Sequence, residues 1–333
     1  MKVGLYLATQ FTPGTDVAQG FAQLLEQVRV ARQSGFASVW AAHHLLVSPV
    51  QMLQPMPLLA RLIPKAGGML IGPNVMILPL LSPVHMAEES ATMDLLSDGN
   101  FVLGVGQGYR NEEFASFGIS PKEWVGRFTE SIEVIKRLWC EERVTFHGQY
   151  YTLDDVGLSL RPVQKPRPPI WAAAVVEPAI KRVARIGDTW MITSYPTLTT
   201  LQRQMKLYQE ALQEVNKPFP DELPAMRECY VSSHHRQALE ECRGPLEYKY
   251  RAYAAWGQDR ILPEADRFDQ PFEELVRDRF LIGDQSYIQE ELLRYQELVG
   301  VNHFTMRVQW PGLEQAKVLR TIESLGHVVR TIA

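Results

Sequence analysis

Cysteine is scarce in this chain: among 333 residues there are three, Cys140, Cys229 and Cys242, and no C-x-x-C pair. Such a sparse, odd set excludes a disulfide framework and a cysteine zinc site, and it is typical of reduced intracellular thiols. Long hydrophobic runs are also missing, so we expect no membrane span. Residues 1–6 look like a strand and lack the features of a signal peptide, so we expect a cytoplasmic protein.

An excess of basic residues is absent too. The formal net charge is -4 at pH 7, which argues against nucleic acid or an anionic membrane as the main partner. The chain has no P-loop, no serine nucleophile elbow, no paired-carboxylate signature and no H-E-x-x-H, and we expect no metal site. What remains for chemistry is glycine-lined backbone, histidines, arginines and aromatics, an inventory that suits holding a flat cofactor.

What the chain does have is a regular alternation of strand-like and helix-like segments. The strand-like segments are 3–8, 37–41, 69–78, 101–105, 170–175, 189–193, 225–232 and 302–308. Eight such units in 333 residues predict a closed (β/α)8 TIM barrel, one domain over 1–333, with insertions after strands four and seven. The second insertion is expected at about 243–270. The alternative, an open doubly wound sheet, would prefer a nucleotide loop after strand one, where residues 9–14 contain a single glycine.

The most informative stretch follows the fourth strand and reads Gly104-Val105-Gly106-Gln107-Gly108-Tyr109-Arg110. Glycines at alternate positions leave one face of a strand end without side chains, so the backbone can lie against a ring or a phosphate. The spacing G-x-G-x-G differs from the dinucleotide fingerprint G-x-G-x-x-G. A tight strand exit with no ligand is the alternative interpretation.

Two adjacent histidines, His43 and His44, follow the second strand. In a barrel the active residues sit at the carboxyl ends of strands, so this pair is the candidate for catalysis. Neighbouring strand residues point to opposite faces, which makes a contiguous pair a poor chelate for one metal ion. We expect one of the two to face the barrel mouth as an acid–base group or a hydrogen-bond donor.

Other candidate residues surround the same mouth. Arg110 and Arg127 could each pair with a phosphate, although Arg127 could equally be an exposed first-turn arginine. The substrate wall is expected from Tyr6, Gln10, Trp40 and Tyr109, together with the insertion around residues 248–256. These side chains favour a small, largely apolar organic ligand.

Several motifs in combination resemble the bacterial luciferase-like flavin-dependent oxidoreductase family, over nearly the whole chain. They are Pro83-Val84-His85-Met86-Ala87-Glu88, Leu95-Leu96-Ser97-Asp98-Gly99, the glycine run through Glu113-Phe114, Arg161-Pro162-Val163-Gln164-Lys165-Pro166 and Gly187-Asp188-Thr189-Trp190. The resemblance implies a TIM barrel, a flavin or deazaflavin cofactor and a homodimer.

The resemblance also implies residue roles. An ungapped match from Trp40 puts the family's active-site histidine at His44, and a one-residue gap puts it at His43. A non-prolyl cis peptide is expected at Asn74-Val75 beneath the isoalloxazine ring, with Gly106 and Gly108 beside it. The phosphate is expected near Val176 and Glu177.

Two departures from the family pattern concern the phosphate. Many members carry arginine where this chain has Gln107, and Ser, Gly or Asn where it has Val176. Arg110, Arg127 and the backbone amides at the start of a helix around Glu177 are the expected replacements.

The leading hypothesis is therefore an FMN-dependent monooxygenase that takes reduced FMN from a separate flavin reductase, reacts with O2 and oxidises a small organic substrate. A second reading is hydride transfer with the deazaflavin F420, whose enzymes commonly carry Asp where His43 stands. A third is a non-catalytic barrel that has lost flavin binding, as Gln107 and Val176 would allow.

Overall fold

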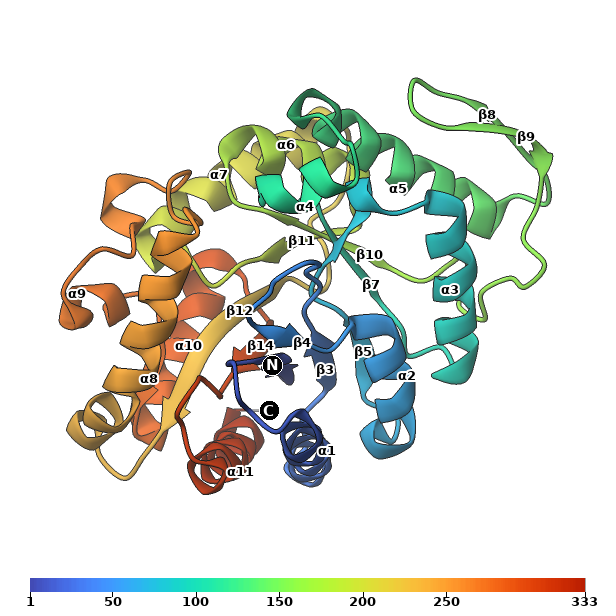
Figure 1. Cartoon of the computed structure of the whole chain (residues 1–333). Coiled ribbons are helices and arrows are strands. Elements are labelled where there is room, and N and C mark those ends of the chain that lie inside the picture. The colour runs from blue at the N-terminus through green and yellow to red at the C-terminus, as the bar shows by residue number, and fades with distance from the viewer. Residues whose placement is uncertain (333) are drawn as a thin grey trace.

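Eight parallel strands form the wall of a barrel in the computed structural model, which describes residues 1–332 (Figure 1). The strands are β1 (Lys2–Leu7), β3 (Ser38–Ala41), β5 (Leu70–Pro73), β7 (Leu103–Gly106), β10 (Ile170–Ala174), β11 (Thr189–Ile192), β12 (Pro224–Val231) and β14 (His303–Arg307). Their pairing order is β5-β3-β1-β14-β12-β11-β10-β7. A bridge between Ile71 and Phe101 brings β5 and β7 together, so the barrel is nearly closed. The predicted (β/α)8 barrel is confirmed.

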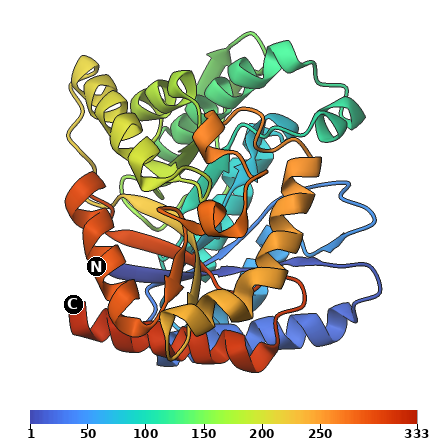
Figure 2. The same cartoon turned by 90° about the vertical axis from the view of Figure 1, so that its left-hand side faces the viewer.

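Helices surround the strands in an outer layer (Figures 1 and 2). They are α1 (Val17–Gln33), α2 (Pro55–Ala66), α3 (Pro83–Leu96), α4 (Asn111–Ser116), α5 (Trp124–Cys140), α6 (Glu177–Ile186), α7 (Leu198–Glu214), α8 (His235–Ala255), α9 (Phe272–Val276), α10 (Gln285–Val299) and α11 (Gln315–Ile332). α1 begins where the Asp16 carboxylate accepts hydrogen bonds from two first-turn N–H groups. The last helix, α11, packs beside α1, so the two chain ends lie close together.

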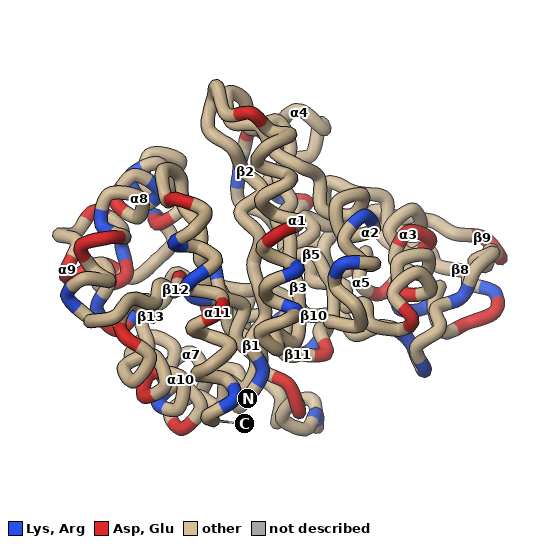
Figure 3. The backbone as a smooth tube through the Cα atoms, turned by 90° about the horizontal axis from the view of Figure 1, so that it is seen from below, with Lys and Arg blue, Asp and Glu red and all other residues tan. Residues whose placement is uncertain are grey.

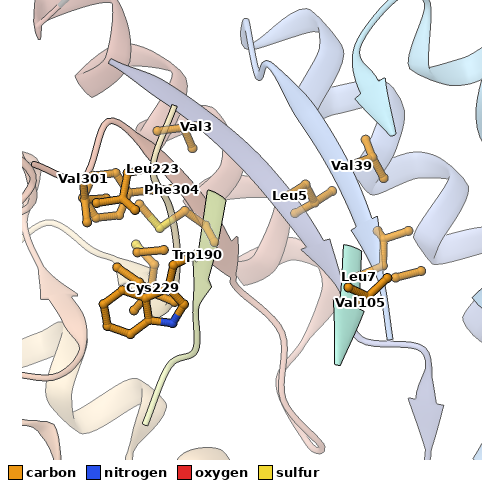
Figure 4. Packing of buried hydrophobic residues seen from close by; sticks show 14 of the residues in the cluster. Val3, Leu5, Leu7, Val39, Val105, Trp190, Leu223, Cys229, Val301 and Phe304 are labelled. Carbon is orange, nitrogen blue, oxygen red and sulfur yellow. The ribbon is translucent and has the colours of Figure 1, made fainter. Parts of the chain in front are cut away.

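The strand side chains alternate between two apolar layers. Val3, Leu5 and Leu7 of β1 point outward into the layer shared with the helices (Figure 4), because successive residues of a strand face opposite sides. Tyr6 points inward and belongs to a separate cluster inside the barrel. In that interior cluster Trp40 stacks on Trp171, with ring centroids 5.0 Å apart.

Several short elements decorate the barrel. β2 (Gln10–Phe11) pairs with β4 (Gln51–Met52), and β8 (Val144–His147) pairs with β9 (Thr152–Val156) in a hairpin between α5 and β10. The remaining elements are η2 (Pro121–Glu123), η3 (Glu264–Asp266) and β13 (Leu281–Gly283), which pairs with β12. The third predicted strand, 69–78, is divided into β5, β6 (Met76–Ile77) and the 3-10 turn η1 (Leu78–Leu80).

The segment expected as an insertion at 243–270 begins inside α8, which continues to Ala255 before the chain leaves the helix. In the view of Figure 3, Lys and Arg residues are interspersed along the chain with Asp and Glu residues. Within residues 1–332, none of the helices has the length and apolar character needed to cross a bilayer.

Candidate functional site

A cavity of about 420 Å³ opens at the carboxyl ends of the barrel strands. Most of the residues expected from the sequence line it, namely Tyr6, Gln10, His43, His44, Asn74, Val75, Gly106, Gln107, Gly108, Tyr109 and Val176. They come from loops that are far apart in sequence and meet because all parallel strands end at the same rim.

His44 is held by a carboxylate from another loop. Its Nδ1 lies 3.0 Å from Oε1 of Glu113, a buried residue of α4. The same oxygen accepts from the Leu45 N–H at 2.8 Å and from Arg110 at 3.3 Å. Burial raises the pKa of Glu113, but the hydrogen bonds from His44 and Leu45 and the charge of Arg110 outweigh it, so the pKa lies below its usual value. An ionised Glu113 requires the His44 proton on Nδ1, which leaves Nε2 for the cavity.

His43 is a different kind of group. It is 4% exposed, and its Nδ1 accepts the Ile77 N–H at 3.1 Å. Burial, and next the neighbouring His44, lower the pKa of His43 to about 4. A neutral imidazole that accepts at Nδ1 carries its hydrogen on Nε2. His43 is therefore a fixed hydrogen-bond donor in the cavity wall.

The Asn74–Val75 peptide is cis, as expected from the family resemblance. Both residues line the cavity, and the Asn74 Nδ2 is buried without a hydrogen-bond partner among residues 1–332. Thr193 and Gln258 line the same cavity, and Thr193 Oγ1 and Gln258 Oε1 are also buried without a hydrogen-bond partner among residues 1–332. Because buried polar groups are normally paired, these atoms indicate a polar ligand with both acceptors and donors.

The glycine run has a more specific role than the sequence indicated. A Cβ on Gly106 would lie 2.5 Å from Cγ2 of Val75, and one on Gly104 would lie 2.0 Å from the carbonyl oxygen of Pro73. Gly108 has φ +83°, a conformation that side chains disfavour. Because these side chains are missing, β7 can approach the Asn74–Val75 segment closely. The main role of the glycines is therefore to bring that segment into position in the cavity wall.

A cationic group stands beside the position where the family has arginine. Arg182 of α6 donates to Oε1 of Gln107 at 3.3 Å, and desolvation lowers the pKa of Arg182. α6 begins at Glu177, after Val176, without a side-chain cap. The positive end of the α6 dipole and the Arg182 guanidinium each favour an anion such as a phosphate, whereas the first-turn carboxylate of Glu177 opposes one.

Four of the expected residues do not line the cavity. Arg127 pairs instead with Glu123 at 2.8 Å and lies over the Tyr150 ring. Trp40 is fully buried in the barrel interior, so it supports the wall from below. Arg110 holds Glu113 and the Leu45 carbonyl. Glu177 begins α6 and is an acidic residue of its first turn.

Sequence reasoning missed two residues that hold lining side chains of the cavity: Glu113, which contacts His44, and Arg182, which contacts Gln107. Glu113 was visible as an acidic residue after the glycines, but its partner His44 is 69 residues away. Arg182 lies five residues after the start of α6, and nothing in the neighbouring sequence distinguishes it from any other arginine of a helix. Within residues 1–332, no cluster of three or more His, Cys, Asp or Glu side chains is placed to hold a metal ion.

Comparison with known proteins decides the family, because residues 1–302 match the family described as luciferase-like monooxygenase. The chain belongs to the luciferase-like monooxygenase family. One relative of this luciferase-like chain is an F420-dependent glucose-6-phosphate dehydrogenase from Amycolatopsis mediterranei. It is 28% identical, with 96% of this chain and 95% of the relative aligned.

A second relative is the oxygenase component of a flavin-dependent trigonelline monooxygenase from Acinetobacter baylyi. It is 23% identical, over 86% of this chain and 83% of the relative. Among solved structures, monooxygenase RslO1 from Streptomyces bottropensis superposes with a TM-score of 0.85 at 23% identity, and all of both chains is covered. That likeness confirms the fold of this luciferase-like chain.

Proposed function

We propose that the protein is a flavin-dependent monooxygenase that uses reduced FMN and O2 on a small organic substrate. The observation that carries the proposal is the Glu113–His44 pair, which holds a cavity-lining imidazole through its Nδ1 in the same cavity as Asn74 and Val75. A histidine oriented by a buried carboxylate is the arrangement expected of an acid–base group.

The residues present fit a flavin. The unpartnered Asn74 Nδ2 would donate to a ring carbonyl, and the apolar wall at Val75 and Ala174 would face the flat ring. Arg182 and the start of α6 would hold the phosphate. When bound, reduced FMN supplies the electrons with which O2 is activated for transfer to a substrate.

The protein's own groups have separate tasks. Glu113 keeps the His44 imidazole in one tautomer and orientation, so that Nε2 can give or take a proton at the reacting end of the cavity. His43, whose low pKa keeps it neutral, would donate a hydrogen bond from Nε2 to a bound ligand. Tyr109, whose ring lies edge-on to His44 at 5.6 Å, helps to fix the imidazole plane.

The relatives support a separate electron donor. The trigonelline monooxygenase relative is named as an oxygenase component, and on that basis a flavin reductase is the partner that supplies reduced FMN.

The expected homodimer has a candidate surface on α3, where Leu95 and Leu96 are 47% and 51% exposed. Large exposed apolar side chains side by side favour burial by a second copy.

The test is a titration of purified protein with reduced FMN under anaerobic conditions, followed by addition of O2. We expect saturable binding, and we expect His44→Ala to retain binding but change the rate at which the flavin is reoxidised. If the protein fails to bind reduced FMN and His44→Ala changes nothing, the proposal is wrong.

A second candidate is F420-dependent hydride transfer, favoured by the relative from Amycolatopsis mediterranei that aligns over 96% of this chain. Parallel titrations with F420 and FMN separate the two, because the tighter-binding cofactor identifies the reaction class. A protein that binds neither would fit the third reading, a barrel without catalytic function.

A further inference from the structure

Arg307 is a buried cation at the end of β14, in the wall of the same cavity. Its side chain is 6% exposed, and its guanidinium lies over the Tyr6 ring at 5.4 Å. Nη1 donates to the Tyr253 hydroxyl at 2.9 Å. The buried Nε has no hydrogen-bond partner among residues 1–332. A guanidinium has five donors, so most of this hydrogen-bonding capacity is unused by the protein.

The carboxylate of Glu228, which is paired in register with Arg307 on the neighbouring strand β12, makes its hydrogen bonds with other residues. Glu228 is fully buried, and its Oε1 accepts from Lys249 Nζ and from the Tyr250 hydroxyl at 3.1 Å. Its Oε2 accepts from Trp310 Nε1. Arg307 forms no ion pair with it within 4.0 Å. The charge of Glu228 is nevertheless shared between Arg307 and Lys249, and burial together with the charge of Arg307 lowers the pKa of Lys249 to about 7.

Arg307 also stands where two cavities meet. A second cavity of about 260 Å³ lies between the loop after β1, α8 and residues 309–313. Gln10, Tyr253, Trp256 and Arg307 line both cavities and separate them. The flavin-binding features, Asn74, Gln107 and the start of α6, line or adjoin only the larger cavity. Arg307 therefore lies where the two cavities meet, whereas Asn74 and Gln107 line the larger cavity and not the smaller one.

We propose that Arg307 is the anion-binding residue of the substrate site, and that the substrate is an organic acid whose carboxylate binds Arg307 while its apolar body extends toward His44. This rests on the proposed function and refines the expectation of a largely apolar ligand. The hydrogen bonds of Glu228 go to Lys249, Tyr250 and Trp310, so the buried Nε donor of Arg307 is left unpaired, which is costly. A planar carboxylate can accept from the unused guanidinium donors in a bidentate manner.

The experiment compares cyclohexanecarboxylate with cyclohexanecarboxamide, two ligands of nearly equal size, by calorimetric titration of the purified protein. We expect the wild type to bind the carboxylate about 10-fold or more tightly than the amide. Arg307→Met should remove this preference, and Arg307→Lys should retain part of it. Arg61→Met, at an exposed position of α2, is the charge-matched control and should leave the preference unchanged.

Equal binding of the two ligands by the wild type would overturn the proposal, and that result does not depend on any variant folding. A preference that survives Arg307→Met but disappears in Arg182→Met would place the anion at Arg182 and would also overturn it. FMN titration is run on the same samples. Retained FMN binding without carboxylate preference removes only the assignment of Arg307, whereas loss of FMN binding with the preference intact removes only the flavin proposal.

Discussion

Glu113 Oε1 and His44 Nδ1 lie 3.0 Å apart although the two residues are separated by 69 positions in the chain. The contact links α4 to the loop after β3, and it sets both the tautomer and the orientation of the imidazole. It also explains why the acidic residue is buried: its charge is compensated by His44, the Leu45 N–H and Arg110.

Replacing Glu113 with Gln should lower turnover by about 100-fold, which is the scale of general acid–base catalysis, because the amide no longer enforces the Nδ1–H tautomer of His44. Cofactor affinity should change little. The measurement is kcat as a function of pH, since loss of the carboxylate should also shift the acidic limb of the profile. Glu112→Gln, at the neighbouring exposed carboxylate of α4, is the matched control. Equal effects of both changes would refute the pairing.

The buried neutral His43 should make the protein less stable in acid. The folded pKa is about 4, whereas the unfolded residue titrates near 6.5, so only the unfolded state takes up a proton between these values. Stability is therefore lost as the pH falls through 6.5, by about 2 kcal/mol between pH 7 and pH 5. His43→Asn keeps an acceptor for the Ile77 N–H without titrating.

Denaturant unfolding at pH 7 and pH 5 checks this. The His43→Asn variant should lose about 2 kcal/mol less than the wild type over that interval. His85→Asn, at a 71% exposed histidine of α3, should lose as much as the wild type. A pH dependence that His43→Asn leaves unaltered would show that His43 titrates normally.

Removing the cation beside Gln107 should weaken binding of the phosphate and not of the ring. Arg182→Met is expected to raise the Kd for FMN about 10- to 100-fold, the range of one charge-assisted hydrogen bond, while the Kd for riboflavin stays the same. Fluorescence titration with the two flavins gives both values. The control is Arg185→Met, on the same helix as Arg182. It removes a surface ion pair with Glu214 of α7 and should affect neither Kd. Equal losses for FMN and riboflavin would contradict a phosphate role.

The close approach of β7 to Val75 makes Gly106→Ala unfavourable. The added methyl would meet Val75 Cγ2 at 2.5 Å, so we expect a loss of about 1–3 kcal/mol and weaker flavin binding. Val75→Ala removes the clashing methyl, and the double variant should recover most of the loss. Gly244→Ala, in α8 with open space around it, should be neutral or slightly stabilising. The measurements are thermal unfolding and FMN titration of the wild type, the two single variants at Gly106 and Val75, and the double variant, with Gly244→Ala as the control.

The sequence predicted the barrel and most of the cavity lining because both follow from local signals. Strand ends such as Asn74 and His44 can be placed once the strands are known, since parallel strands end at one rim. Side-chain partners cannot be placed in this way. Arg127 has the residue type for a phosphate, but it pairs with Glu123 four residues earlier, whereas Arg182 of α6 donates to Gln107 at the cavity. Trp40 points into the barrel because the strand pleat turns it there.

The two walls of the cavity come from different parts of the architecture. His44, Asn74 and Gly106 sit at or just after barrel strands, whereas Tyr253, Trp256 and Gln258 belong to the end of α8 and the turn after it. A change in that turn leaves every strand end in place. Substitutions or length changes near residues 253–261 would therefore reshape one wall of the cavity while the residues at the strand ends, Arg307 included, keep their places, and libraries restricted to this segment are an economical way to vary the ligands that the cavity accepts.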